Sequence, residues 1–284
     1  MPELQIINKK NPWPKGWGQK TSIMGVINLT PDSFSDGGEL NSSKKVLDQV
    51  NHFLCSGVDI IDLGAQSTRP GAEEVGSTLE IKRLIPYLKL IKSKFPEILI
   101  SIDTFNSDVA HEALLNGANW INDVTGGRRD KEILDVVEKF NCPFVITHSR
   151  GNSTNMNELS KYGDVVSEVK SSLDTLLKNA LEKRISKQNI ILDPGIGFSK
   201  DTNQNLEILK NLDVFKQFDL PILIGASRKR FIGEILNEKN PKERDIGTLA
   251  ISCLCSHFNI DIVRVHNVKM NSQILKVADK IFRK

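Results

Sequence analysis

The stretch from Met24 to Gly38, MGVINLTPDSFSDGG, begins as an apolar run and ends as a polar loop closed by glycines. The apolar part, residues 23–29, predicts a buried strand, and one amide, Asn28, stands near its end. A buried amide without partners is costly, so packing does not explain Asn28. A strand that delivers a polar side chain at its carboxyl end and continues into a loop is typical of active sites in α/β folds.

The same pattern repeats along the chain, where apolar runs rich in Ile and Val alternate with amphipathic stretches. Such alternation predicts parallel strands with right-handed crossovers, and eight such units predict a (β/α)₈ TIM barrel. A doubly wound open sheet is the alternative, but no glycine fingerprint follows the first strand. The predicted strands are 23–29, 58–63, 98–103, 119–122, 143–147, 189–193, 221–225 and 261–265, and the predicted helices include 43–56, 78–94, 131–140, 164–184, 244–258 and 270–282.

A chain of 284 residues fits one large domain, because α/β barrels commonly run to about 250 residues. We expect a single barrel domain over 23–284, preceded by an extension over 1–22 that could form a short hairpin across the barrel floor. The net charge of +3 is too small and too dispersed to indicate nucleic-acid binding. The four cysteines lack metal or disulfide spacing and predict buried thiols in a reducing cytoplasm. No signal peptide and no membrane-spanning run are predicted.

Every predicted strand finishes in a polar or ionisable residue. Because the carboxyl ends of barrel strands surround one mouth, we expect these side chains to meet there. The residues are Asn28, Asp62, Asp103, Asn122 with Asp123, His148, Asp193, Ser227 with Arg228, and Arg264 with His266.

Two carboxylates and an amide, Asp103, Asp193 and Asn122, stand on interior strands. Together they suit a flat heterocycle with several N–H donors, such as the 2-amino-4-oxo edge of a pterin or a guanine, because a carboxylate pairs in bidentate fashion with such an edge. The alternative for Asp193 is turn capping, since Asp-Pro-Gly is common turn chemistry.

Cations gather after the seventh and eighth strands, in Ser227-Arg-Lys-Arg-Phe231 and Arg264-Val-His266. Barrels often bind phosphate at this place, with a helix N-terminus behind it. A solvated charged face or a basic targeting signal is the alternative. Two further loops, Thr30–Leu40 and Gln66–Gly71, have a composition suited to lids that close over a substrate.

Seven blocks of the chain resemble the dihydropteroate synthase family. They occur in order from position 24 to 266 and are Met24–Gly38, Asp62–Gly71, Ser101–Phe105, Ile121–Asp123, Leu192–Phe198, Gly225–Lys229 and Arg264–His266. The resemblance implies a transferase that joins 6-hydroxymethyl-7,8-dihydropterin diphosphate to para-aminobenzoate and releases pyrophosphate. It also implies a Mg²⁺ cofactor, a homodimer and inhibition by sulfonamides.

The resemblance also implies roles for individual residues. Catalytic roles fall on Asn28, Asp103, Lys229, Arg264 and His266. The pterin is expected among Asp103, Asn122, Asp193, Lys229 and Arg264, and the diphosphate on Asn28, Arg264 and His266. Mg²⁺ is expected on Asn28 and Asp32. The para-aminobenzoate site and its loops are expected to comprise Asp32, Ser33, Phe34, Thr68, Arg69, Pro70, Gly71, Phe198, Lys229 and Arg230.

The chain departs from the usual pattern of that family at three places: Arg230 stands where serine is common, His148-Ser-Arg150 replaces a Met-His-Met type of segment, and Asn267 stands where aspartate is common. Two alternative functions remain open from the sequence. One is a methyltetrahydrofolate-type corrinoid methyltransferase on a related pterin-binding barrel. The other is a non-catalytic pterin-binding paralogue.

Overall fold

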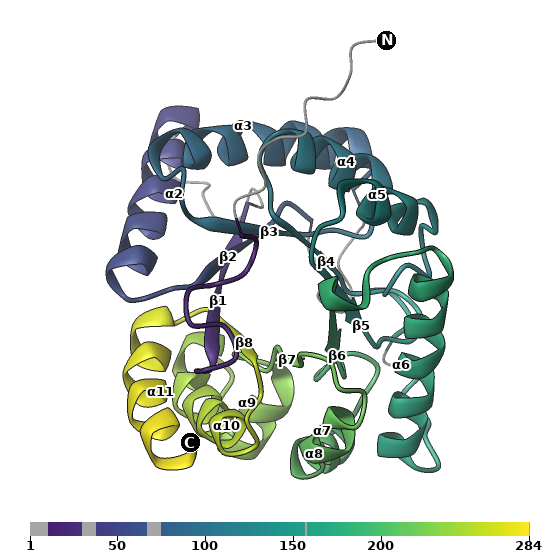
Figure 1. Cartoon of the computed structure of the whole chain (residues 1–284). Coiled ribbons are helices and arrows are strands. Elements are labelled where there is room, and N and C mark those ends of the chain that lie inside the picture. Colours follow the sequence, from purple (N-terminus) through teal and green to yellow (C-terminus); the bar gives the residue numbers. More distant parts are fainter. Residues whose placement is uncertain (1–10, 30–37, 67–74, 157, 284) are drawn as a thin grey trace.

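The computed structural model describes residues 11–29, 38–66, 75–156 and 158–283. A ring of parallel strands stands at the centre and helices surround it (Figure 1). The strands are β1 (Ser22–Asn28), β2 (Ile60–Gly64), β3 (Leu99–Asp103), β4 (Trp120–Asp123), β5 (Phe144–Thr147), β6 (Ile190–Asp193), β7 (Leu223–Ile224) and β8 (Ile262–Val265). All eight strands predicted from the sequence are therefore present, each shifted by a few residues at most.

The helices follow the strands in the expected alternation. They are α2 (Gly38–Cys55), α3 (Ser77–Lys94), α4 (Ser107–Leu115), α5 (Glu132–Phe140), α6 (Val165–Glu182), α7 (Thr202–Lys210), α8 (Leu212–Lys216), α9 (Arg230–Leu236), α10 (Asp245–His257) and α11 (Val268–Phe282), with 3₁₀ turns at Lys187–Asn189 and Pro241–Arg244. The six predicted helices are all found, whereas α4, α7, α8 and α9 were not among them. Helix α3 illustrates the packing, because Leu84, Leu88 and Ile91 recur on one face and are fully buried.

The sheet closes into a barrel at a narrow seam. Its strand order is β6-β5-β4-β3-β2-β1-β8-β7, and a single parallel bridge between Leu192 and Ile222 joins the two outer strands. Across that seam the backbone N–H of Leu192 donates to the carbonyl of Pro221 at 2.9 Å. The (β/α)₈ barrel is confirmed, and the open doubly wound sheet is wrong.

The lower half of the barrel interior is apolar. One buried residue from each of seven strands fills it, namely Met24, Ile60, Trp120, Val145, Ile191, Leu223 and Ile262. Trp13 and Trp17 pack against this layer from below, with ring centroids 5.0 Å and 6.0 Å from that of Trp120. The indole N–H of Trp120 donates to the carbonyl of Pro12 at 2.6 Å. Within residues 11–21 the extension that seals the floor forms turns and contains no strand of a hairpin.

The prediction for the cysteines is wrong in part. Cys142 and Cys255 are buried, but Cys55 at the end of α2 is exposed and Cys253 is half-buried. No helix in the described part of the chain is long and apolar enough to cross a membrane.

Candidate active site

Strand register brings three polar side chains and one glycine level with one another at the carboxyl ends of four adjacent strands. Asn28 on β1 is level with Gly64 on β2, Gly64 with Asp103 on β3, and Asp103 with Asn122 on β4. These residues follow the apolar floor residues by an even number of positions, and alternate residues of a strand share a face, so they point into the barrel. Gly64 leaves room between its neighbours: a Cβ there would lie 3.5 Å from Asp103 Cβ and 3.8 Å from Asn28 Oδ1.

A guanidinium joins two buried carboxylates inside the barrel mouth. Arg264 on β8 donates from Nε to Oδ2 of Asp62 and from Nη2 to Oδ2 of Asp103, both at 2.7 Å. Asn122 donates from Nδ2 to the same Asp62 oxygen at 3.3 Å. The sequence identified Asp62 only as a polar strand end and gave it no role, yet it is fully buried and contacts two of the residues expected to bind pterin.

Burial shifts the pKa values of this cluster. It raises the pKa of Asp103 to about 7. The positive charge of Arg264 lowers this pKa, and the negative charge of Asp62 raises it. Burial alone would lower the pKa of Arg264, but the charges of Asp62 and Asp103 outweigh it and raise that pKa. Within the described residues, Oδ1 of Asp62 and Oδ1 of Asp103 have no hydrogen-bond partner. The cluster thus offers buried oxygens that a ligand with N–H donors can satisfy.

Asp193 has two separate environments, one for each carboxylate oxygen. Its Oδ1 accepts the backbone N–H of Gly195 at 2.7 Å, which is the turn capping considered from the sequence. Its Oδ2 would lie 3.8 Å from a Cβ placed on Gly225, and Arg264 Cβ lies at the same distance from that point. One oxygen therefore holds the turn after β6, and the other faces the interior near Arg264. Burial raises the pKa of Asp193, and the Gly195 N–H and Lys229 oppose the shift.

Lys229, which precedes α9, faces the loop after β6. Its Nζ lies 3.9 Å from the centroid of the Phe198 ring and donates to the carbonyl of Ile196. Burial lowers its pKa to about 8, although Asp193 opposes the shift. Gly197 has a φ of +78°, and a Cβ there would lie 2.4 Å from Lys229 Cδ, so only glycine fits beside this lysine.

An open cleft of about 510 Å³ adjoins the mouth, and Asn28, Arg228 and His266 line it together with a face of α2. His266 lies close to Ser227 Oγ through its backbone N, at 3.2 Å, and through Nδ1, at 3.0 Å. The α2 residues are Lys45, Asp48 and Gln49, whose spacing of three and four places them on one side of the helix. The sequence analysis did not include Lys45 among the site residues. Its helical spacing to the polar residues Asp48 and Gln49 could have indicated a polar face of α2.

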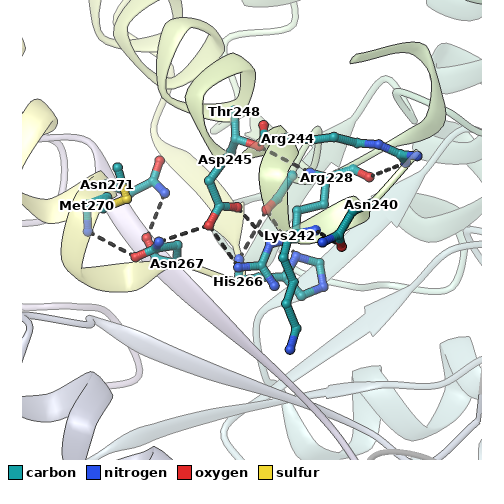
Figure 2. Close-up of polar contacts among 11 residues, drawn as sticks. Arg228, Asn240, Lys242, Arg244, Asp245, Thr248, His266, Asn267, Met270 and Asn271 are labelled. Atoms are coloured by element: carbon teal, nitrogen blue, oxygen red, sulfur yellow. Dashed lines mark hydrogen bonds and ion pairs between the residues drawn. The ribbon is translucent and has the colours of Figure 1, made fainter. Parts of the chain in front are cut away.

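Figure 2 shows that the guanidinium of Arg228, which the sequence placed in a cluster of cations, is paired with a carboxylate. Its Nε and Nη2 donate to the two oxygens of Asp245, at 2.7 Å and 2.8 Å, and Asn267 donates to the second of these oxygens at 2.9 Å. Arg228 has a φ of 59°, and its backbone N–H donates to Thr248 Oγ1 at 3.1 Å. The counterion Asp245 on α10 was not recognised in the sequence.

Some of the remaining predicted residues lie away from the mouth, and others are not among the residues that the structure describes. Arg230 is exposed and pairs with Glu234 at 3.2 Å on α9. Asp123 caps the next turn by accepting the N–H groups of Thr125 and Gly127, at 2.7 Å and 2.6 Å. His148 is buried and bonds to Lys200 at 3.0 Å. The expected loop residues Asp32, Ser33, Phe34, Thr68, Arg69, Pro70 and Gly71 lie outside the described residues.

The chain offers no dedicated metal cage in the segments that the structure describes, since no group of three or more His, Cys, Asp or Glu side chains there could hold an ion. Mg²⁺ often needs only one or two protein oxygens and completes its shell with phosphates and water. The amide oxygen of Asn28, at the edge of the cleft, is a donor of this kind. The residues present therefore fit a Mg²⁺ ion that arrives with a diphosphate.

Comparisons with known proteins agree with this arrangement. A model of the pterin binding enzyme family matches residues 24–266. The dihydropteroate synthase of Synechocystis sp. is 43% identical over 267 residues, which cover 94% of this chain and 92% of that protein. A Clostridium difficile dihydropteroate synthase, crystallised in the presence of pteroic acid, is 40% identical with a TM-score of 0.89 and covers 95% of this chain and 100% of that chain.

A second solved structure, the Xanthomonas albilineans dihydropteroate synthase in complex with 7,8-dihydropteroate, is 31% identical with a TM-score of 0.83 and covers 94% of this chain and 95% of that chain. Similarity of this extent, over almost the whole chain, favours the synthase over the corrinoid methyltransferase. The chain belongs to the dihydropteroate synthase family of pterin-binding enzymes.

Proposed function

We propose that this protein condenses 6-hydroxymethyl-7,8-dihydropterin diphosphate with para-aminobenzoate to give 7,8-dihydropteroate and pyrophosphate. The observation that carries the proposal is the buried cluster of Asp62, Asp103 and Arg264 beside an open cleft with Asn28 and His266. The cluster suits a flat nitrogen heterocycle, and the cleft suits its anionic arm.

The pterin ring is proposed to lie in the barrel mouth among Asp103, Asn122, Asp193, Lys229 and Arg264. Unpartnered carboxylate oxygens in this part of the described structure, on Asp62 and Asp103, support the placement because the ring carries several N–H donors. The raised pKa of Asp103 is compatible with either protonation state near neutral pH, so this group can follow a change of charge on the ring.

The diphosphate is proposed to occupy the cleft, where Asn28, Arg264 and His266 would contact it. A Mg²⁺ ion held by Asn28, with Asp32 as the second expected ligand, would offset the negative charge that grows on the leaving oxygen. Lys45 lines the same cleft and adds positive potential near the leaving group, whereas the charge of Arg228 is matched by Asp245.

Loss of pyrophosphate leaves a positive charge that the pterin ring delocalises, and the carboxylate of Asp103 can stabilise that charge. The aniline nitrogen of para-aminobenzoate then attacks the pterin methylene. The amine is unprotonated at neutral pH, and the proton that its nitrogen releases after the C–N bond forms passes to water or to the departing pyrophosphate, so no strong general base is needed.

The second substrate is proposed to bind beside Phe198 and Lys229. The Nζ of Lys229 lies 3.9 Å from the centroid of the Phe198 ring. The loop residues Asp32, Ser33, Phe34, Thr68, Arg69, Pro70 and Gly71 are proposed to complete this site and to exclude water from the cation. Arg230 is exposed and pairs with the exposed Glu234, so a role in binding the substrate carboxylate requires its side chain to turn toward the loop. We expect sulfonamides to compete for the same place.

We further propose a single barrel domain over 23–284 that works as a homodimer in the cytoplasm. Exposed apolar side chains on α10 and α11 support a dimer, since Ile246, Val277 and Ile281 are 64%, 61% and 67% exposed. The free thiols of all four cysteines suit a reducing compartment. Light scattering of the purified protein tests the dimer, and a monomeric mass would contradict it.

The test of the activity is pyrophosphate release by the purified protein in the presence of both substrates and Mg²⁺. We expect release only when all three are present, together with formation of 7,8-dihydropteroate. Binding of pterin diphosphate without any turnover would contradict the proposed reaction and would favour a non-catalytic pterin-binding protein.

A further inference from the structure

Lys200, at the end of the loop that follows β6, is a buried lysine that is only 5% exposed. Its Nζ lies 2.9 Å from the carbonyl oxygen of Gly195, 3.0 Å from that of Phe198 and 3.0 Å from Nδ1 of His148. An ammonium group has three N–H donors, so each finds one acceptor. Lysine is almost never fully buried unless it is paired in this way, so the burial of Lys200 indicates a structural or functional role for its three hydrogen bonds.

His148 acts as an acceptor in this arrangement. Burial lowers its pKa to about 2, and the charges of Lys200, Arg128 and Arg150 add to the shift. The ring is therefore neutral at physiological pH, and Nδ1 can carry the lone pair that accepts from Lys200.

The first contact of Lys200 leads to the barrel interior. Gly195 gives its carbonyl to Lys200, and its own N–H donates to Oδ1 of Asp193 at 2.7 Å. Gly195 has a φ of +72°, and a Cβ there would clash with the carbonyl oxygen of His148, so only glycine fits at this turn. Lys200 thus fixes the residue that orients the Asp193 carboxylate.

The second contact leads to the other side of the pocket. Phe198 gives its carbonyl to Lys200, while its ring lies 3.9 Å from Nζ of Lys229. Between them, Ile196 gives its carbonyl to Lys229. Lys200 therefore bonds to the first and last carbonyls of the segment 195–198, and Lys229 contacts the same segment at Ile196 and Phe198.

We propose that Lys200 is a positioning residue for the pterin and para-aminobenzoate sites and touches neither substrate. Through Gly195 it fixes the carboxylate of Asp193. Through Phe198 it fixes the contact between the Phe198 ring and Lys229. The inference rests on the placement of the two substrates proposed above. It explains why this loop has a buried lysine where a polar surface residue would suffice for a simple turn.

The decisive variant is Lys200→Met, which keeps the length and apolar volume of the side chain but removes three donors. Loss of these bonds frees the loop, and we expect the Kd of pteroic acid, measured by calorimetry, to rise about tenfold. The Kd of Mg²⁺-pyrophosphate is expected to stay unchanged, because the cleft around Asn28 and His266 is not built from this loop. Lys210→Met on the exposed face of α7, where Lys210 is 71% exposed, is the matched control and should alter neither value.

A loss of affinity for both ligands in parallel would point to general destabilisation and overturn the proposal, as would unchanged binding of pteroic acid. If Lys200→Met fails to fold, a second pair decides. His148→Asn keeps an acceptor at the δ position and should bind pteroic acid as the wild type does, whereas His148→Leu removes the acceptor and should bind it more weakly. Equal affinities in this pair would overturn the proposal. Failure of the wild-type protein itself to bind pteroic acid would instead contradict the proposed function.

Discussion

Nε of Arg264 on β8 lies 2.7 Å from Oδ2 of Asp62 on β2, although 202 residues separate them in the chain. The pair joins strands on either side of β1, and the guanidinium continues to Asp103 at 2.7 Å. Taking these charges out of water is costly, and removal of one partner leaves the other poorly compensated. The Asp62–Arg264 contact is therefore as important to stability as to binding.

Asp62→Asn is expected to lower the free energy of unfolding by about 2 kcal/mol, because the buried Arg264 then keeps one hydrogen-bonded carboxylate, Asp103, instead of two. Urea denaturation at neutral pH measures the change. Asp174→Asn is the control, since Asp174 forms an exposed pair with Lys178 on α6 at 2.7 Å. That change should remain under about 0.5 kcal/mol. Similar effects of the two substitutions would contradict a special role for the buried pair.

The pKa of Asp103 makes stability depend on pH. Burial raises it from 3.8 to about 7 in the folded protein, so the folded state holds a proton that the unfolded state releases. Stability from this group is fully present below the unfolded pKa and is lost as pH rises through about 7. The expected slope is up to about 1.4 kcal/mol per pH unit.

Asp103→Asn has no proton to lose and should flatten that slope. Urea midpoints of the two proteins at several pH values from mildly acidic to mildly alkaline provide the measurement. Parallel curves for variant and wild type would show that Asp103 titrates at an ordinary pKa.

The same substitution tests the chemistry. We expect Asp103→Asn to lower turnover by about a hundredfold or more, because it removes a preorganised charge from beside the pterin cation. Circular dichroism should show an intact fold, and Asp108→Asn on the exposed face of α4 should keep full activity. A fully active Asp103→Asn enzyme would refute the proposed stabilisation of the cation.

Lys229 is expected to set an alkaline limit to activity. Its pKa is lowered to about 8, so the side chain loses its charge as pH rises through that value. Therefore kcat/KM should fall above about this pH. Lys229→Arg keeps its charge throughout, because arginine does not titrate in this range. The pH profile of that variant should lack the decline, whatever its absolute activity, and an unchanged profile would exclude Lys229 as the titrating group.

Asn28 is expected to control the requirement for Mg²⁺. Chelation should abolish pyrophosphate release, and added Mg²⁺ should restore it. Asn28→Leu removes the amide oxygen, so we expect the half-saturating Mg²⁺ concentration to rise at least about tenfold. Gln49→Leu, on the α2 side of the same cleft, is the matched control. An equal Mg²⁺ requirement in wild type and Asn28→Leu would place the ion elsewhere.

The fold was predictable from the sequence because each buried strand is a short apolar run and each run is followed by a helical pattern. Two of the four missing helices have a simple cause: α8 and α9 span Leu212–Lys216 and Arg230–Leu236 and are too short for a clear period. The seam between β6 and β7 was also beyond reach, since β7 pairs over Leu223–Ile224 alone.

The site was predictable in part, because strand-end polar residues converge in any barrel. What the sequence did not give is the choice of partners. Asp245 on α10 binds Arg228 in the turn before α9, and Lys200 looks like a solvated loop residue until the structure buries it. The inward position of Asp62 follows from its even spacing to Ile60 on the floor, a signal that was present but not used.

Trp13, Trp17 and Trp120 are all the tryptophans of the chain, and they lie together at the floor. Intrinsic indole emission of this protein therefore comes from the end of the barrel opposite to the mouth. It should follow the docking of the amino-terminal segment during refolding, whereas occupancy of the mouth needs a reporter placed there.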